Sequence, residues 1–381
     1  MRFGLSEEQR MLCDAVSKAL AKHVPLERVK SHAKGTAPAS DDLWAAVVDA
    51  GIPSVLVPAE HGGLGLGLLE AALVAEMLGR YVAPVQFIGT AVLAPLALQL
   101  AGSKQQKSEW LGRLATGDAR LGVAICEAAG TGRDGAEVRN SGNVLYGKSL
   151  FVLDSTGADA FVVADSAGGL HLVDATAPGV ELIDVSTIDV TRFVAELRLA
   201  GVRSEPLCSG NASHAITRMI EAAWVMFAAD TLGAAQRMIE LAVNYSAERV
   251  QFGRPIGTFQ AVKHMCATMA AALEPCRALI WYAAYAQDQS FDDASLTAAH
   301  AKAQLAEVGR MVARTSVQVH GGIGITDELG LHFWFKRIGF GRQIYGGPEE
   351  VRRFAARLQG MLADSNLGGV DRTTMKRGIC G

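Results

Sequence analysis

The chain has 381 residues, and its 36 lysines and arginines against 39 aspartates and glutamates give a formal charge of -3. A chain of this length is expected to fold as two or three domains, and its nearly balanced charge argues against an extended nucleic-acid groove. Half of the residues are hydrophobic, but alanines, glycines and charged residues interrupt every long apolar stretch, so no membrane span is predicted.

Residues 1–118 are predicted to form a helical domain. Ser6, followed by Glu8 and Gln9, indicates a helix N-terminus, and apolar residues then recur at helical spacing. Short loops rich in glycine and proline join further helices. The glycine run at 62–67 lacks the Lys-Ser/Thr of a phosphate loop and is interpreted as a sharp turn.

Residues 119–208 are predicted to form a β-domain, either barrel-like or a sandwich. The Asn-Ser-Gly-Asn segment at 140–143 indicates a hairpin turn. Turn residues separate short runs of β-branched and apolar residues, at 144–146, 160–164, 170–173 and 192–195.

Residues 209–363 are predicted to form a bundle of long helices, and residues 364–381 a mobile tail. The whole chain is therefore expected to be an α+β protein with a helical domain, a β-barrel-like domain and a four-helix bundle. A bundle rich in alanine and glycine with few exposed charges buries more than one face, so self-association or a partner is expected.

The six cysteines form no C-x-x-C pair and no regular framework, and no charged-then-apolar leader opens the chain. A reduced, cytoplasmic location is therefore expected. No spacing of histidine, cysteine and aspartate suggests a metal site.

Two turns in the predicted bundle each combine a polar side chain with glycine. The first, from Glu248 to Gln260, holds Arg249, Phe252 and Gly253, and the second, at 318–324, holds Gln318 beside two glycines. Such a pairing joins a group able to meet phosphate to a place where a ligand can approach the backbone closely. It predicts an anionic cofactor between helices. Taken separately, the glycines could form a tight turn and the arginine could be a cation favoured by the helix dipole.

These segments resemble the acyl-CoA dehydrogenase family of flavoproteins. The family's Arg-x-x-Phe-Gly turn, with a following Ile and Gln, is similar to Arg249, Phe252, Gly253, Ile256 and Gln260. Its Gln-x-x-Gly-Gly-x-Gly turn is similar to Gln318, Gly321, Gly322 and Gly324. Near the N-terminus, the likeness continues in Val57-Pro58, Gly62-Gly63-Leu64-Gly65 and Leu78-Gly79-Arg80.

The resemblance implies FAD between the β-domain and the bundle, reaching a neighbouring subunit, and α,β-desaturation of an acyl-CoA thioester. A carboxylate would take the α-proton while hydride leaves to the flavin. Electron-transferring flavoprotein is the implied electron acceptor. The implied cofactor-binding residues are Arg249, Gln251, Phe252, Gln260, Gln318, Val319, Gly321 and Gly322.

The family's catalytic carboxylate has no counterpart here. Its Tyr-Glu-Gly-Thr segment is matched by a stretch in which the base position is Gly346. In members that carry the base on the first C-terminal helix, the matching position is Ala223, and the neighbouring arginine is Trp224. The nearest carboxylate, Glu221, is two residues away and is turned by about 200° on a helix. The catalytic residue is therefore left unassigned, with Glu221 as the candidate.

The flavin-ring pocket of the family is also altered. Its Thr-Glu-Pro segment is matched by Cys126-Glu127-Ala128, and its Trp-x-Thr by Phe151-Val152-Leu153. The run at 130–134 lacks the family's serine. A thiol and an aliphatic side chain cannot supply the expected hydroxyl hydrogen bonds.

Three hypotheses follow. The first is a subunit of a heterotetrameric acyl-CoA dehydrogenase that lends its cross-subunit FAD site to a partner carrying the base. The second is a self-sufficient enzyme, such as a homotetramer, with Glu221 or a carboxylate near Glu349-Glu350 as base. The third is a non-catalytic assembly subunit. Paired bacterial relatives imply bulky substrates such as steroid side chains or dicarboxylic acids.

Overall fold

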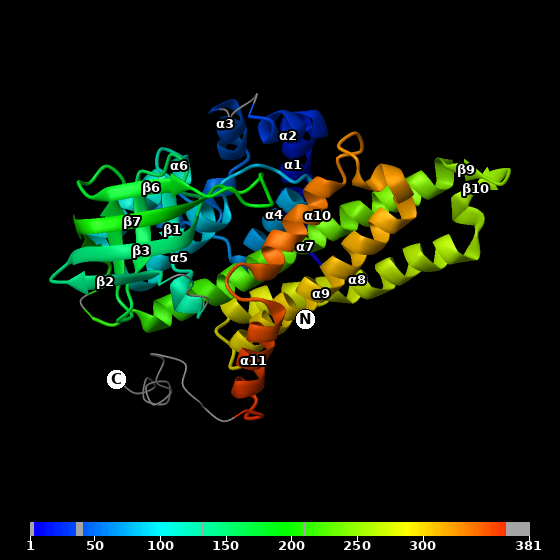
Figure 1. The fold of residues 1–381 in the computed structure, drawn as a ribbon. Coiled ribbons are helices and arrows are strands. Elements are labelled where there is room, and N and C mark those ends of the chain that lie inside the picture. Colours follow the sequence, from blue (N-terminus) through cyan, green and yellow to red (C-terminus); the bar gives the residue numbers. More distant parts are fainter. Residues whose placement is uncertain (1–3, 36–40, 131–132, 134, 209, 363–381) are drawn as a thin grey trace.

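The computed structural model describes residues 4–35, 41–130, 133, 135–208 and 210–362. Helices, a β-sheet and long helices follow one another in the chain, which confirms the predicted α+β fold (Figure 1). The sheet and the β9–β10 hairpin lie at opposite ends of an elongated molecule. The predicted tail at 364–381 lies outside the described residues.

Two of the N-terminal helices begin at a serine side-chain cap. Ser6 Oγ accepts a hydrogen bond from the Gln9 N–H at 3.2 Å, and the Gln9 side chain accepts one from the Ser6 N–H at 2.9 Å. Ser103 and Gln106 repeat this arrangement. The helices are α1 (Glu7–His23), α2 (Leu26–Ala33), α3 (Asp41–Asp49), α4 (Leu68–Arg80), α5 (Ala94–Ala101) and α6 (Lys104–Thr116), with short helical turns at Ile52–Ser54, Ala59–His61 and, in π form, Ile88–Leu93.

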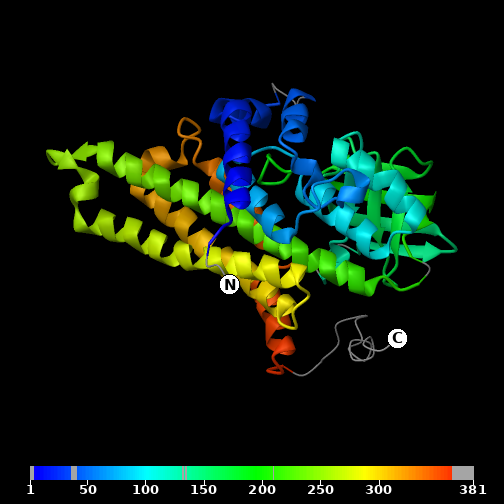
Figure 2. The same cartoon turned by 180° about the vertical axis from the view of Figure 1, so that it is seen from behind.

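The sheet has the order β6-β7-β3-β1-β4-β5-β8, and β2 pairs with the first half of the long strand β3. Asn143, at φ +64°, turns β2 into β3, which confirms the predicted hairpin. The strands are β1 (Leu121–Ala124), β2 (Glu137–Ser141), β3 (Val144–Leu153), β4 (Ala160–Ala164), β5 (Leu170–Asp174), β6 (Val180–Asp184), β7 (Val194–Arg203) and β8 (Glu205–Pro206). Seen from behind, the cyan helices α5 and α6 lie over the sheet (Figure 2).

The C-terminal part is built around α7, a 36-residue helix that is buried along most of its length. The small hairpin β9–β10 joins α7 to α8. The elements are α7 (Ser213–Glu248), β9 (Val250–Gln251), β10 (Arg254–Pro255), α8 (Gln260–Asp288), α9 (Ala294–His320), α10 (His332–Gln343) and α11 (Pro348–Leu358), with short helical turns at Glu127–Ala129, Ile256–Thr258 and Gly321–Ile325.

A buried group of charges joins these parts. Arg337 on α10 donates hydrogen bonds to Asp230 on α7, the closest at 2.7 Å, to the Ala83 carbonyl at 3.0 Å and to Thr191 Oγ1 at 2.8 Å. Arg192 lies 2.7 Å from the same aspartate. These contacts connect the N-terminal helices, the sheet region and the bundle. The predicted domain divisions after 118 and 208 stay a prediction, with α6 ending at Thr116 and α7 beginning at Ser213.

Among the described residues, no helix combines the length and the apolar character needed to cross a membrane.

Candidate functional site

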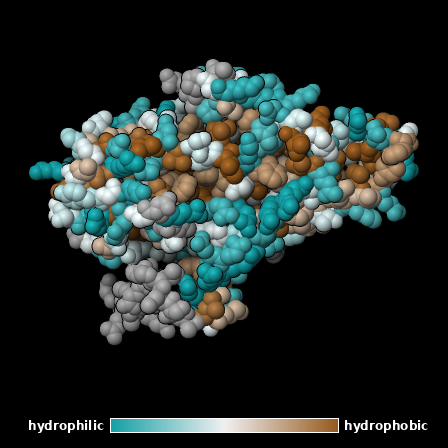
Figure 3. Space-filling view, viewed as in Figure 1, coloured by the Kyte–Doolittle hydropathy of each residue, from teal (hydrophilic) through white to brown (hydrophobic). Residues whose placement is uncertain are grey.

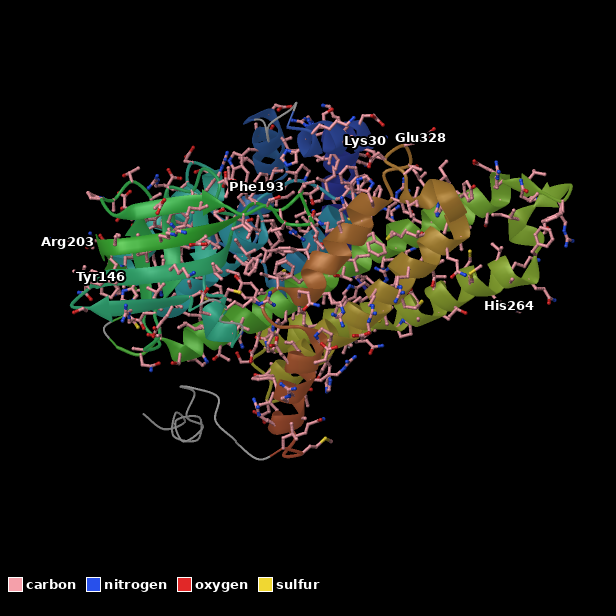
Figure 4. The ribbon with its side chains drawn as sticks, in the orientation of Figure 1. Lys30, Tyr146, Phe193, Arg203, His264 and Glu328 are labelled. Carbon is pink, nitrogen blue, oxygen red and sulfur yellow. The ribbon has the colours of Figure 1, made fainter. Side chains whose placement is uncertain are left out.

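The two glycine-containing turns lie at the same end of the bundle. Arg249 follows the last residue of α7, and Gly321 follows the last residue of α9. The rings of Tyr245 and His320, one turn or less before these ends, have centroids 4.8 Å apart. This end carries the β9–β10 hairpin in Figure 1, and His264 marks it in Figure 4.

Most of the predicted cofactor-binding residues face solvent here. Phe252 is 92% exposed at the tip of the hairpin. The remaining exposed members of the predicted set are Arg249, Gln251, Gln260, Gln318, Gly321 and Gly322. Val319 differs, because its side chain is buried in the core and only its backbone could meet a ligand.

The backbone at both turns is open to close approach. Gly253 and Gly321 have φ of +77° and +63°, a region that favours glycine. A Cβ added at Gly321 or Gly322 would have no heavy atom within 4 Å. Within the part of the chain that the structure describes, Arg249 has neither an ion-pair nor a hydrogen-bonding partner for its side chain. The two turns therefore offer an unpaired guanidinium and accessible backbone on one surface.

The segment at the usual base position is held by two side chains from other helices. Trp224 Nε1 on α7 donates to the Tyr345 carbonyl at 2.7 Å. Lys302 on α9 donates to the Gly341 carbonyl and, at 2.9 Å, to that of Ile344. Gly346 itself has φ +104°, where L residues are strained. The segment is fixed by hydrogen bonds, and the carboxylate near the Gly346 position is that of Glu350, whose Oε2 would lie 3.6 Å from a Cβ added at Gly346.

Two of the residues matched to the family's ring pocket, Cys126 and Leu153, are buried, whereas Phe151 is half-buried and Ala128 is exposed. Cys126, Leu153, Phe227 and Tyr345 are all at most 4% exposed and belong to one core cluster. The rings of Phe227 and Tyr345 have centroids 6.1 Å apart. Burial raises the pKa of Tyr345 well above its usual range. The Tyr345 hydroxyl has no hydrogen-bond partner among the described residues.

The nearby carboxylates have structural partners. Glu221 is buried and accepts a hydrogen bond from Gln287 Nε2 of α8 at 3.0 Å. Glu350 accepts from the Gly347 N–H at 3.0 Å at the start of α11, and Glu349 pairs with Arg342 at 3.3 Å. Glu221 thus faces α8, whereas Trp224 and Phe227 on the same helix contact Tyr345.

Two buried ionisable groups near the segment around Gly346, Asp154 and Lys302, were not predicted from the sequence. Asp154, just after β3, accepts from the N–H groups of Gly89 at 2.7 Å and Thr90 at 3.0 Å, and burial raises its pKa to about 6. Burial lowers the pKa of Lys302 to about 7. In the sequence, each of these charged residues stands in a mostly apolar segment, which indicates a buried charge. The sequence does not show which groups such a charge contacts.

Comparisons with known proteins identify the family. A model of the acyl-CoA dehydrogenase N-terminal domain matches residues 6–118, and one of the C-terminal domain matches residues 214–357. Acyl-CoA dehydrogenase IpdE2 of Mycobacterium tuberculosis is 32% identical over 91% of this chain and 96% of its own length. The chain belongs to the acyl-CoA dehydrogenase family.

Two solved structures of the family carry names of paired proteins. The ChsE4-ChsE5 complex from Mycobacterium tuberculosis matches with a TM-score of 0.86 and 28% identity, covering 95% of this chain and 100% of that one. The Tcur3481-Tcur3483 steroid ACAD G363A variant matches with a TM-score of 0.84 and 29% identity, covering 93% and 98%. A second curated relative, FadE27 of Mycobacterium tuberculosis, is 31% identical over 83% of this chain and 88% of its own length.

Acyl-CoA dehydrogenases are FAD-dependent oxidoreductases that act on CH–CH bonds, so the predicted family, enzyme class and cofactor are confirmed. The described residues fit one end of FAD better than the other. The exposed guanidinium and the open glycines suit the diphosphate and adenosine of FAD. Cys126 and Leu153 are buried where the resemblance puts the flavin ring.

Proposed function

We propose that this chain is one subunit of a heteromeric FAD-dependent acyl-CoA dehydrogenase that desaturates the α,β bond of an acyl-CoA thioester. In this proposal the partner subunit carries the catalytic carboxylate, and this subunit lends part of the partner's FAD site. The observation that carries the proposal is the contrast between the two ends of the molecule. Gly346 has no side chain that could act as a base, and Cys126 and Leu153 are buried, whereas Arg249 and Phe252 are exposed at the end that carries the β9–β10 hairpin.

Each exposed residue has a distinct part in the proposed site. Arg249 would pair with the diphosphate through charge-assisted hydrogen bonds, and Gln318 would donate to it from α9. Gly321 and Gly322 would let the cofactor approach the backbone, and Phe252 would cover it with an aromatic face. The predicted contacts of Gln251, Gln260 and Val319 are part of the same proposal. FAD, when bound, accepts the hydride that leaves the β-carbon.

The surroundings of this end support burial in an assembly. Brown, hydrophobic atoms gather over it in Figure 3. They include the exposed side chains of Val250, Phe252 and Ile325, which are 53%, 92% and 76% exposed. Exposed apolar side chains that gather in one place and are rimmed by polar residues mark interaction surfaces.

The named relatives support the finer parts of the proposal. The ChsE4-ChsE5 complex and the Tcur3481-Tcur3483 steroid ACAD are each named for two proteins. We therefore propose that this chain is part of a heterotetramer that acts on a bulky acyl-CoA, such as one with a steroid side chain. Electron-transferring flavoprotein as the acceptor and a cytoplasmic location complete the proposal.

The test compares arginine variants in the complex of this chain with the subunit that co-purifies with it. Arg249→Ala should weaken FAD retention about 10- to 100-fold, because one charge-assisted hydrogen bond contributes about 1.5–3 kcal/mol. Arg203→Ala is the matched control, since Arg203 is exposed at the opposite end of the molecule (Figure 4). Flavin absorbance after gel filtration gives the readout, and equal flavin content in both variants would contradict the proposal.

A self-sufficient enzyme is the second candidate, because Glu221 Oε1 is buried without a hydrogen-bond partner among the described residues. In that case Glu221→Gln or Glu350→Gln should abolish acyl-CoA oxidation by the chain alone. Unchanged rates in both variants remove this candidate. A complex that assembles but holds no FAD would instead favour a non-catalytic assembly subunit.

A further inference from the structure

Two arginines on α9 extend the surface that holds Gln318. Arg310 and Arg314 precede it at intervals of four residues, so the three side chains stand on successive turns, about 6 Å apart along the helix axis. All three are exposed. Arg310 lies about 12 Å along the axis from Gln318, beyond a single diphosphate group held at that glutamine.

The chain supplies no anion for these two cations. Within the described ranges, neither Arg310 nor Arg314 takes part in an ion pair or a side-chain hydrogen bond. Glu307, one turn before Arg310, lies 3.1 Å from Arg342 and 3.9 Å from Arg352. Like charges four residues apart destabilise a helix by about 0.2–0.5 kcal/mol. An anion from outside the chain would offset this cost.

Further exposed cations lie at the same end of the bundle, on or next to α7, the β9–β10 hairpin and α8. Arg249 ends α7, Arg254 lies in the β9–β10 hairpin and Lys263 is in the first turn of α8. The chain as a whole has a formal charge of -3. Together with Arg310 and Arg314, these cations outnumber the exposed carboxylates of Glu248, Asp327 and Glu328 at this end, so this end is locally cationic on an overall acidic protein, which favours contact with an acidic surface.

We propose that Arg310 and Arg314 contact an acidic surface of the partner subunit, and that they favour an unlike partner over a second copy of this chain. The inference rests on the proposed function and names the chemistry of its partner. In a two-fold symmetric homodimer built through this face, the arginine-bearing surfaces of the two copies would lie in one interface, and copies of the same arginine would face each other near the two-fold axis. Repulsion between like charges disfavours such a homodimer, whereas the same arginines attract a partner with an acidic surface.

The experiment measures association of the purified chain with the isolated partner subunit at about 50 mM and about 500 mM NaCl. The double variant Arg310→Glu with Arg314→Glu should lower the association rate constant about 10-fold at the lower salt, and the difference should shrink at the higher salt. The milder pair Arg310→Gln with Arg314→Gln should lower it about 3-fold. Flavin content per assembled complex should stay at the wild-type level.

The matched control is Arg139→Glu with Arg203→Glu, an equal charge change on exposed residues of the sheet. Association that is equally fast for both double glutamate variants would overturn the inference. So would a loss of flavin from complexes that assemble at the normal rate, because the arginines would then belong to the cofactor site. Failure of the proposed function looks different, since the wild-type complex would then lack either assembly or flavin.

Discussion

At the scale of single residues, two substitutions distinguish this chain from the family pattern. Gly346 removes the carboxylate at the usual position, and Trp224 replaces a cation with an indole that donates to the Tyr345 carbonyl. The sequence alone predicted both substitutions, because they lie within recognisable motifs. It could not predict the hydrogen bond from Trp224 to the Tyr345 carbonyl, because these residues are 121 positions apart.

Restoring the carboxylate should not restore catalysis. Gly346→Glu is expected to lower the free energy of unfolding by about 1–3 kcal/mol, because a φ of +104° strains an L residue. The variant chain alone should not oxidise an acyl-CoA, since Cys126 and Leu153 still stand where the family has hydroxyls that bind the flavin ring. Urea unfolding and dye reduction are the measurements. Gly210→Glu, at an exposed glycine with no heavy atom within 4 Å of an added Cβ, is the control.

The raised pKa of Asp154 predicts a pH dependence of stability. Its pKa is about 6 in the folded chain against 3.8 ordinarily, so the folded state favours the protonated form. The stabilising contribution of protonation is complete below pH 3.8 and is lost as the pH rises through about 6. Asp154→Asn should therefore gain stability relative to the wild type over this range, by up to about 3 kcal/mol. Urea unfolding at several pH values tests it, and a difference that does not change with pH contradicts it. The exposed Asp184→Asn is the control.

At the scale of elements, local patterns predicted a large part of the fold. The cap at Ser6 and the turn at Asn143 act on residues that are neighbours in sequence, so the local sequence pattern was enough to predict them. The charges that join elements did not follow from the sequence. Asp230 and Arg337 are 107 residues apart, and only the packing of α7 against α10 brings them together.

The stability of the folded chain should depend on Asp230, the carboxylate that Arg337 and Arg192 share. Asp230→Asn leaves Arg337 and Arg192 buried with less negative charge, which is expected to cost about 3–5 kcal/mol. Glu196→Gln, in an ion pair with the half-exposed Arg198, should cost about 1 kcal/mol or less. Denaturant unfolding followed by circular dichroism measures the free energy of unfolding of both variants. Similar losses in the two would contradict the role given to the buried charges around Asp230.

At the scale of the whole molecule, the two ends differ in character. Beside the sheet, Cys126 and Leu153 at positions of the family's ring pocket are buried, and the far end exposes the residues predicted to meet the diphosphate and adenosine of FAD. The family motifs are short, so the sequence was enough to predict that the turns at 249–253 and 318–324 act together. The exposure of these turns and the burial of Cys126 and Leu153 depend on packing between distant elements, so only the structure shows them.

The flavin content of this chain, alone and in its native complex, tests the central claim most directly. We predict that the chain purified without a partner is colourless, and that the complex holds one FAD per pair of unlike subunits, which an acyl-CoA reduces. A yellow single chain with one flavin per subunit, reduced by an acyl-CoA, would contradict the account.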